Sequence, residues 1–204
     1  MVYNMMTHII DPKLTHRQRQ IIIGTILGGS SIVKPSGGRN SYLSMRGKDA
    51  DWLEYKAIEL KCLTSNKPFT VEKTNRWHSL CYPLFNEYRD MFYSKGQRKL
   101  TVNVLEECYL SDIAFSIWYG DCCKYDRGHI IINTHIWKES GTKAVVKFFD
   151  LMDMKAEVYM ERSRFRVKLD EVATREIMKL IQPHLPYFYV TRRSTPFRRS
   201  NRDQ

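Results

Sequence analysis

Basic and apolar side chains alternate along SRFRVKL, residues 163–169. If this run is a strand, Arg164, Arg166 and Lys168 share one face, because successive side chains of a strand point to opposite faces. The apolar residues between them would pack on helices, while the three cations would remain available to anions. Guanidinium and ammonium groups in such an array contact phosphate oxygens or the base edges of a nucleic acid. The chemistry that this face offers is anion recognition.

The charge of the whole chain points to the same class of partner. The 204 residues include 33 Lys and Arg against 22 Asp and Glu, which gives a net charge of +11 and a pI near 9.5. A polyanion is therefore the expected partner, with nucleic acid ahead of an anionic membrane surface. Residues 191–204 hold five arginines and one aspartate, so they contribute +4 and leave +7 on the rest. No apolar run approaches the roughly 18 residues of a membrane span, and the five cysteines lack the spacing of a disulfide framework or a zinc site.

A second pattern concerns glycines within apolar runs. Gly24 and Gly28 lie four residues apart in GTILGG, although each glycine inside a helix costs about 1 kcal/mol relative to alanine. Ser116 and Gly120 have the same spacing in SIWYGD. Small residues four apart allow two helices to approach closely. We therefore predict that these two helices pack against each other.

The two helices open two copies of one element order: helix, strand, helix, strand, strand, helix. In the first copy the predicted elements are residues 15–28, 41–47, 49–63, 68–75, 76–82 and 83–93. In the second copy they are residues 111–121, 129–135, 141–152, a strand pair in 156–170, and 171–181, with 122–128 as a loop. The pattern predicts an α+β fold of two pseudo-symmetric halves, residues 1–105 and 106–190, followed by a basic tail, residues 191–204.

This organisation resembles the LAGLIDADG homing endonucleases in their single-chain form with two motifs. The resemblance covers about residues 15–190 and rests on LTHRQRQIIIGTILGGSSI, residues 14–32, and LSDIAFSIWYGDC, residues 110–122. In that family the paired helices form the interface between the halves, and each half supplies an antiparallel sheet that lies in the DNA major groove. Each motif ends in an acid that binds a divalent metal.

The chain departs from the family pattern at one of the two acids. The resemblance places Asp121 at the acid position of the second motif but Gly29 at that of the first. A one-residue shift would place Cys122 there instead, but it breaks the small-residue spacing. A metal polarises the phosphoryl oxygens and lowers the pKa of the attacking water. With Asp121 and the carbonyl groups of Gly28 and Gly29 as metal ligands, we expect cleavage that is unequal between strands, restricted to one strand, or lost.

The resemblance also implies further site residues. Lys99 and Arg192 resemble the basic residues of the family's catalytic pocket, one for each half, so the predicted catalytic set is Asp121, Gly29, Lys99 and Arg192. The predicted DNA-binding residues lie on or beside the predicted strands: Lys34, Arg39, Arg46, Arg76, His78, Lys124, Arg127, Arg164, Arg166 and Lys168.

The leading hypothesis is a monomeric, Mg²⁺-dependent endonuclease that binds a specific site in double-stranded DNA, with Ca²⁺ or Mn²⁺ as substitute metals. The alternative is a protein without cleavage activity, either a DNA-binding protein or a maturase whose partner is intron RNA. We expect a cytoplasmic or organellar protein that is not secreted and has no membrane partner.

Overall fold

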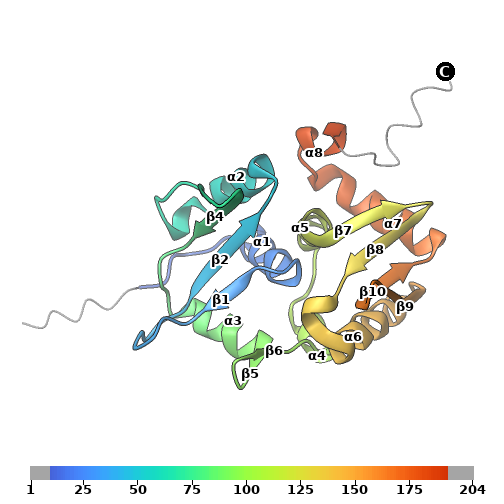
Figure 1. The fold of residues 1–204 in the computed structure, drawn as a ribbon, viewed down its shortest axis with the longest axis horizontal. Coiled ribbons are helices and arrows are strands. Elements are labelled where there is room, and N and C mark those ends of the chain that lie inside the picture. The colour runs from blue at the N-terminus through green and yellow to red at the C-terminus, as the bar shows by residue number, and fades with distance from the viewer. Residues whose placement is uncertain (1–9, 193–204) are drawn as a thin grey trace, which may run out of the picture. The chain divides into compact units, whose positions relative to one another are not determined.

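The computed structural model describes residues 10–192, with side chains as far as residue 190 (Figure 1). Its helices are α1 (His16–Leu27), α2 (Ala50–Glu59), α3 (Leu84–Phe92), α4 (Val102–Glu107), α5 (Asp112–Cys122), α6 (Lys138–Leu151), α7 (Glu171–Ile181) and α8 (Tyr187–Arg192). Short 3-10 turns occur at η1 (Lys61–Leu63), η2 (His135–Trp137) and η3 (Gln182–His184). Within residues 10–192, no helix has the length and apolar character needed to cross a bilayer.

The strands form two four-stranded antiparallel sheets and one small ribbon. The first sheet has the order β1-β2-β4-β3, from β1 (Ser31–Val33), β2 (Tyr42–Gly47), β3 (Phe69–Val71) and β4 (Thr74–His78). The second has the order β7-β8-β10-β9, from β7 (Cys123–Asp126), β8 (His129–Asn133), β9 (Ala156–Glu161) and β10 (Arg164–Leu169). The ribbon pairs β5 (Tyr93–Ser94) with β6 (Gln97–Arg98). The repeated strand order confirms the predicted duplication and the α+β class.

The described chain divides into two compact units that each contain one of these sheets. Unit 1 comprises residues 10–15 and 31–91, and unit 2 comprises residues 16–30 and 92–192. Helix α1 therefore belongs with α5 and the second sheet, although it precedes the first sheet in the sequence. The boundary predicted at residue 105 stays a prediction.

Four hairpins are closed by two-residue turns in which both central residues have positive φ. These pairs are Glu72 and Lys73, Lys95 and Gly96, Arg127 and Gly128, and Arg162 and Ser163. Positive φ at both positions is typical of type I′ turns, whose twist matches that of the flanking strands. The turn at Arg127 and Gly128 corrects one prediction: residues 122–128 are not a loop, because Cys123–Asp126 pair with β8 as strand β7.

The core of unit 1 lies between its sheet and helix α2. Asp49 caps α2, because its carboxylate accepts a hydrogen bond from the backbone N–H of Trp52 at 3.1 Å. Trp52 and Leu53 are buried, as are Met45 of β2 and Trp77 of β4. The helix thus covers one face of the sheet and leaves the other face to polar side chains.

Unit 2 repeats this layering with two helices. Helices α6 and α7 pack on strands β8, β9 and β10, as the yellow and orange segments of Figure 1 show. Val167 and Leu169 of β10 are buried, while Arg164, Arg166 and Lys168 are exposed or half-buried. The predicted alternation in SRFRVKL is therefore confirmed.

Helix α1 is buried from Gln20 to Leu27. The Gln20 side-chain amide donates to the carbonyl oxygens of Cys108 and Tyr109 at 3.4 and 3.2 Å and accepts from the N–H of Ser111 at 2.9 Å. Because Ser111 is the N-cap of α5, this one buried amide ties α1 to the start of α5.

Candidate active site and nucleic-acid interface

The two motif helices meet at glycines of α1. A Cβ atom built on Gly24 would lie 2.5 Å from the carbonyl oxygen of Ala114 and 2.8 Å from the Cβ of Ile117. A Cβ atom on Gly28 would overlap the Cβ of Asp121. The predicted close packing of these helices is confirmed, and Gly28 provides the space that the Asp121 side chain occupies.

The partners of the two glycines differ from the predicted small residues. Ala114, Ile117 and Asp121 share one side of α5, whereas Ser116 and Gly120 are rotated from it by roughly 90–130° at 100° per residue. Both are buried, and the Gly120 carbonyl oxygen lies 3.5 Å from the hydroxyl of Tyr189 in α8. On α5 the atoms nearest to Gly24 and Gly28 therefore belong to Ala114, Ile117 and Asp121, and the equivalence of Ser116 and Gly120 with Gly24 and Gly28 stays a prediction.

A guanidinium group lies at the end of α1, beside Gly29. The Nη2 of Arg98 donates to the carbonyl oxygens of Gly29 and Ser30 at 2.9 and 2.8 Å. Its guanidinium carbon also lies 5.3 Å from the ring centroid of Trp137 and 5.8 Å from that of Tyr93. A fixed cation therefore occupies the surroundings of the Gly29 carbonyl.

Lys99, the residue after Arg98, makes no such contact with the end of α1 through its side chain among the described hydrogen bonds. Lys99 was predicted as the basic residue of this pocket, but its side chain is exposed, and its backbone N–H donates to the Phe92 carbonyl at 2.8 Å. The catalytic role of Lys99 stays a prediction. The side chain of Arg192 lies outside the described side chains, and residues 193–204 of the basic tail lie outside the described residues.

The donor set at the helix ends fits one divalent cation and not two. Among the described residues, no three His, Cys, Asp or Glu side chains come together as a ligand set. Asp121 supplies one carboxylate, which suffices for Mg²⁺ when substrate phosphates and water complete the shell. At Gly29 no carboxylate is present, and a second cation would be repelled by Arg98. Asp121 would thus hold the metal, with the Gly28 and Gly29 carbonyl groups as weaker candidates.

Gly29 has φ = +117°, a conformation that residues with a side chain rarely adopt. We expect Gly29→Ala to lower the stability by about 1–2 kcal/mol because of this backbone conformation, although the added methyl group would make only an ordinary contact, 3.7 Å from the Cδ1 of Ile136. For a protein of this size the loss corresponds to a fall in Tm of roughly 3–6 °C. Thermal unfolding followed by circular dichroism measures it, with Gly47→Ala as the control, since a Cβ there meets nothing within 4 Å. An unchanged Tm would show that the end of α1 has a different conformation.

The polar face of the second sheet carries a network of ion pairs. Glu161 accepts from Arg166 at 2.6 Å and from Lys124 at 3.3 Å, and Lys124 also lies 3.8 Å from Asp126. Lys168 pairs with Glu157 at 3.7 Å. The predicted DNA-binding cations Lys124, Arg166 and Lys168 therefore lie together on one face, but each has an acidic neighbour.

The polar face of the first sheet has fewer charges. Arg46 and Arg76 are paired across β2 and β4, and Ser44 and His78 form the next pair but one. Burial, and then the charge of Arg76, lowers the pKa of His78, so its ring is neutral at pH 7. Tyr42 and Phe69 flank that ring at centroid distances of 5.6 and 5.5 Å.

Arg76 and Arg166 hold matching positions in the two sheets, which the sequence alone did not reveal. Each belongs to the third residue pair from its hairpin turn, and each lies opposite an aromatic residue of the edge strand: Phe69 for Arg76 and Tyr159 for Arg166. In both arginines the Nε atom is buried without a hydrogen-bond partner among the described residues. Counting residue pairs from each predicted turn would have shown this equivalence.

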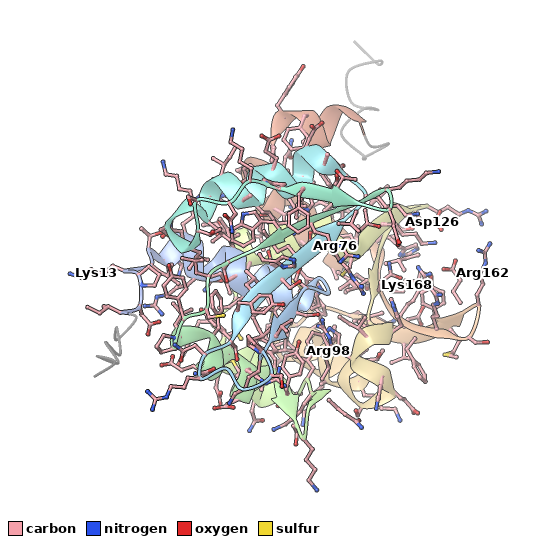
Figure 2. All side chains as sticks on the ribbon, turned by 60° about the vertical axis from the view of Figure 1, so that its left-hand side comes forward. Lys13, Arg76, Arg98, Asp126, Arg162 and Lys168 are labelled. Atoms are coloured by element: carbon pink, nitrogen blue, oxygen red, sulfur yellow. The ribbon has the colours of Figure 1, made fainter. Side chains whose placement is uncertain are left out.

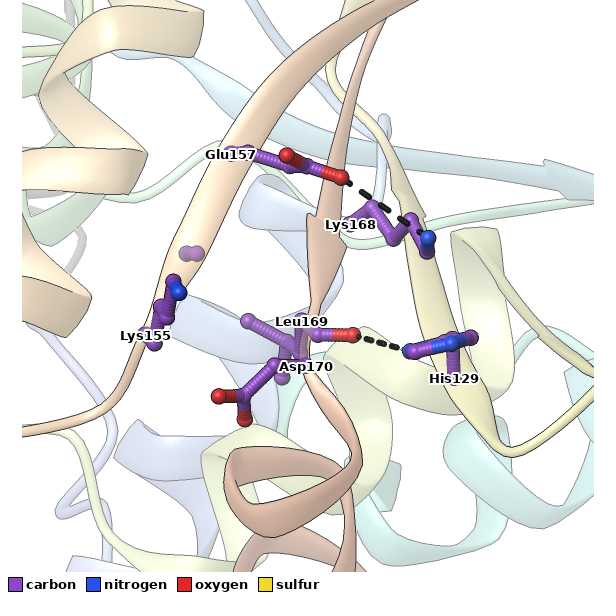
Figure 3. A pocket seen from close by; sticks show the side chains of 7 residues that line it. His129, Lys155, Glu157, Lys168, Leu169 and Asp170 are labelled. Carbon is purple, nitrogen blue, oxygen red and sulfur yellow. Dashed lines mark hydrogen bonds and ion pairs between the residues drawn. The ribbon is translucent and has the colours of Figure 1, made fainter.

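The remaining predicted DNA-binding residues lie near the sheets. Lys34 and Arg39 are exposed in the segment between β1 and β2, and Arg127 is exposed in the turn after β7. Figure 2 shows Lys168 and Asp126 on the second sheet, and Arg162 at the tip of the β9–β10 hairpin. A pocket of about 170 Å³ opens beside Lys168, where the Nδ1–H of His129 donates to the Leu169 carbonyl at 2.9 Å (Figure 3).

Comparisons with known proteins agree with this architecture. The structure is similar to that of the homing endonuclease I-WcaI bound to its DNA recognition sequence, with a TM-score of 0.80, 14% identity, and coverage of 88% of this chain and 86% of that one. It is also similar to I-DmoI in complex with DNA and Mn (TM-score 0.53, 11% identity, coverage 81% and 96%). A third similar structure is full-length DUF199/WhiA from Thermatoga maritima (TM-score 0.55, 10% identity, coverage 88% and 60%).

Sequence comparison gives the family. No curated protein matches the chain in sequence. The profile of the LAGLIDADG DNA endonuclease family matches residues 19–177, which include both motif helices and both sheets up to α7. The chain therefore belongs to the LAGLIDADG DNA endonuclease family.

Proposed function

We propose that this protein binds a specific site in double-stranded DNA and hydrolyses its phosphodiester bonds with one Mg²⁺ ion held by Asp121. The observation that carries the proposal is the single carboxylate seated in the space that Gly28 leaves at the α1–α5 crossing. Relatives of this fold were solved with DNA and Mn or Ca, which supports a divalent metal in the same role. When bound, the ion would polarise the scissile phosphate and activate a water molecule.

Residues of both units would bind the DNA duplex. The polar sheet faces, with Arg46 and Arg76 in unit 1 and Lys124, Arg166 and Lys168 in unit 2, would position the duplex through phosphates and base edges. The halves 1–105 and 106–190 in one chain favour a monomer. A cytoplasmic or organellar, non-secreted location follows from DNA as the substrate and remains a prediction.

The one-acid centre predicts unequal cutting of the two strands. With a carboxylate at Asp121 and a glycine at position 29, supercoiled plasmid carrying the site should accumulate nicked circles before any linear product. The site is obtained by selection from a random duplex library, and gel electrophoresis over time measures the species. Mg²⁺ removal by EDTA should stop both cuts. Linear product formed without a nicked lag would mean that the two cuts are equivalent.

A second candidate function is DNA binding or intron RNA splicing without cleavage. It is favoured by Gly29, which stands where the resemblance to the family places the first of the two acids. Without that carboxylate the metal-dependent step would be lost, while the basic sheet faces would still bind nucleic acid.

The two candidates differ in what Asp121 must do. Sequence-specific DNA binding without nicks in Mg²⁺ would favour the binding protein. Stimulated splicing of a host intron that persists in Asp121→Ala would favour the maturase. Site-specific nicking that is lost in Asp121→Ala supports the endonuclease.

A further inference from the structure

Glu161 has no counterpart in the first sheet, although the arginines beside it do. It flanks the β9–β10 turn, and the equivalent place at the β3–β4 turn is held by Val71. Arg166 therefore has a carboxylate partner, whereas Arg76 has no ion pair among the described residues. Arg76 and Arg166 thus hold equivalent positions in the two sheets, but only Arg166 is paired with a carboxylate among the described residues.

The Glu161 carboxylate links three strands of the second sheet. Its partners Arg166 and Lys124 lie on β10 and β7, and Glu161 itself ends β9. Strands β7 and β9 are the two edges of this sheet, roughly 14 Å apart at 4.8 Å per strand. The two long side chains bridge this separation, with 3.3 Å between Lys124 Nζ and Glu161 Oε1.

The network holds Arg166 in one place. The Arg166 side chain is only 14% exposed, and its Nη2 is 2.6 Å from a Glu161 oxygen. The hydrogen bond from Lys124, followed by the nearby charge of Arg166, keeps the pKa of Glu161 below its ordinary value, so the carboxylate stays ionised at neutral pH. An arginine fixed and neutralised in this way contributes little non-specific attraction to phosphates, but its remaining donors keep a defined direction.

We propose that Glu161 is a specificity-determining residue, which positions Arg166 to read one base pair and keeps both Arg166 and Lys124 from acting as free phosphate contacts. The base pair carries a guanine, whose O6 and N7 accept from arginine in the major groove. Arg76, without such a carboxylate, binds the backbone of the other half-site. This inference rests on the proposed DNA-binding function.

The test compares Glu161→Gln with Glu157→Gln, a matched control on the same strand and the same face. Glu157 pairs only with Lys168, at 3.7 Å and with 68% of its side chain exposed (Figure 3). Each variant and the wild type selects sites from a random duplex library, and fluorescence anisotropy then measures binding of single-base variants at several salt concentrations.

For Glu161→Gln we expect the preference for one guanine to fall about tenfold, and the slope of log K against log salt to steepen by about one unit as the freed cations bind phosphates. Arg166→Ala should reduce the base preference at the same base pair. Arg76→Ala should weaken binding to all sequences about equally. Glu157→Gln should keep the wild-type base preference. Thermal unfolding confirms that each variant is folded.

The outcomes separate two failures. If the wild type selects no site, the proposed DNA-binding function fails and this inference fails with it. If the wild type selects a site that Glu161→Gln and Arg166→Ala read with unchanged base preference and salt slope, the DNA-binding function stands and the role of Glu161 is refuted.

Discussion

Gly24→Ala is expected to destabilise the protein by about 2–3 kcal/mol, even though alanine is the better helix former by about 1 kcal/mol. The added Cβ would lie 2.5 Å from the Ala114 carbonyl oxygen and 2.8 Å from the Ile117 Cβ. The obstructing atoms belong to the backbone and to a Cβ, so neither can rotate away, and the helices must separate. Overpacking of this kind typically costs 1–3 kcal/mol, occasionally more. Urea unfolding followed by circular dichroism measures the loss.

Gly47→Ala is the control for this experiment. Its added methyl group meets nothing within 4 Å, so its urea midpoint should stay close to that of the wild type. If Gly24→Ala unfolds at the same urea concentration as Gly47→Ala, the helices of unit 2 are not packed as closely as described, and the space for Asp121 beside Gly28 is also in question.

The motif helices were predictable because their sequences contain the physical reason for their packing. An apolar run that tolerates two glycines four apart must place its backbone against another element, and α1 does so at Gly24 and Gly28. The partner residues Ala114 and Ile117 were not predictable, because they depend on the angle at which the helices cross. A spacing shared by two helices does not fix which sides of them meet.

The strand β7 and the ribbon β5–β6 were missed for different reasons. The residues Cys-Lys-Tyr-Asp of β7 do alternate between apolar and polar side chains, but the run is only four residues long and follows the motif helix directly, so its pairing with β8 was not recognised. The strands β5 and β6 have two residues each, too few for any period. Arg98 lies on this ribbon and donates to the Gly29 carbonyl oxygen. Because the ribbon was not predicted, this contact was not predicted either.

Glu161 was missed because its partners are distant in sequence. Lys124 precedes it by 37 residues, and Arg166 follows it beyond a tight turn. Lys124 and Arg166 were predicted to bind DNA because they are basic, but the acid that pairs with both was not predicted. The face is therefore less positive than its basic residues alone suggest.

Asp121→Asn is expected to lower the rate of DNA cleavage by about 10³-fold, or about 4 kcal/mol of transition-state stabilisation. Asparagine has the size and shape of aspartate, so the space opposite Gly28 remains filled and the packing of α1 on α5 is retained. Only the negative charge is lost, and with it the single charged ligand available to the metal. Nicking of supercoiled plasmid in Mg²⁺ measures the rate, while anisotropy at the same salt should give DNA affinity close to that of the wild type.

Two further measurements decide whether Asp121 acts through the metal. Calorimetric titration of the DNA complex with Ca²⁺ should show one site in the wild type and a much weaker one in Asp121→Asn, because a neutral amide is a poor ligand for a hard cation. Cys122→Ser is the matched control, and it should retain both the metal site and the nicking rate. If instead Asp121→Asn keeps its nicking rate and its Ca²⁺ site, the acid at the crossing only fills the space beside Gly28 and binds no metal.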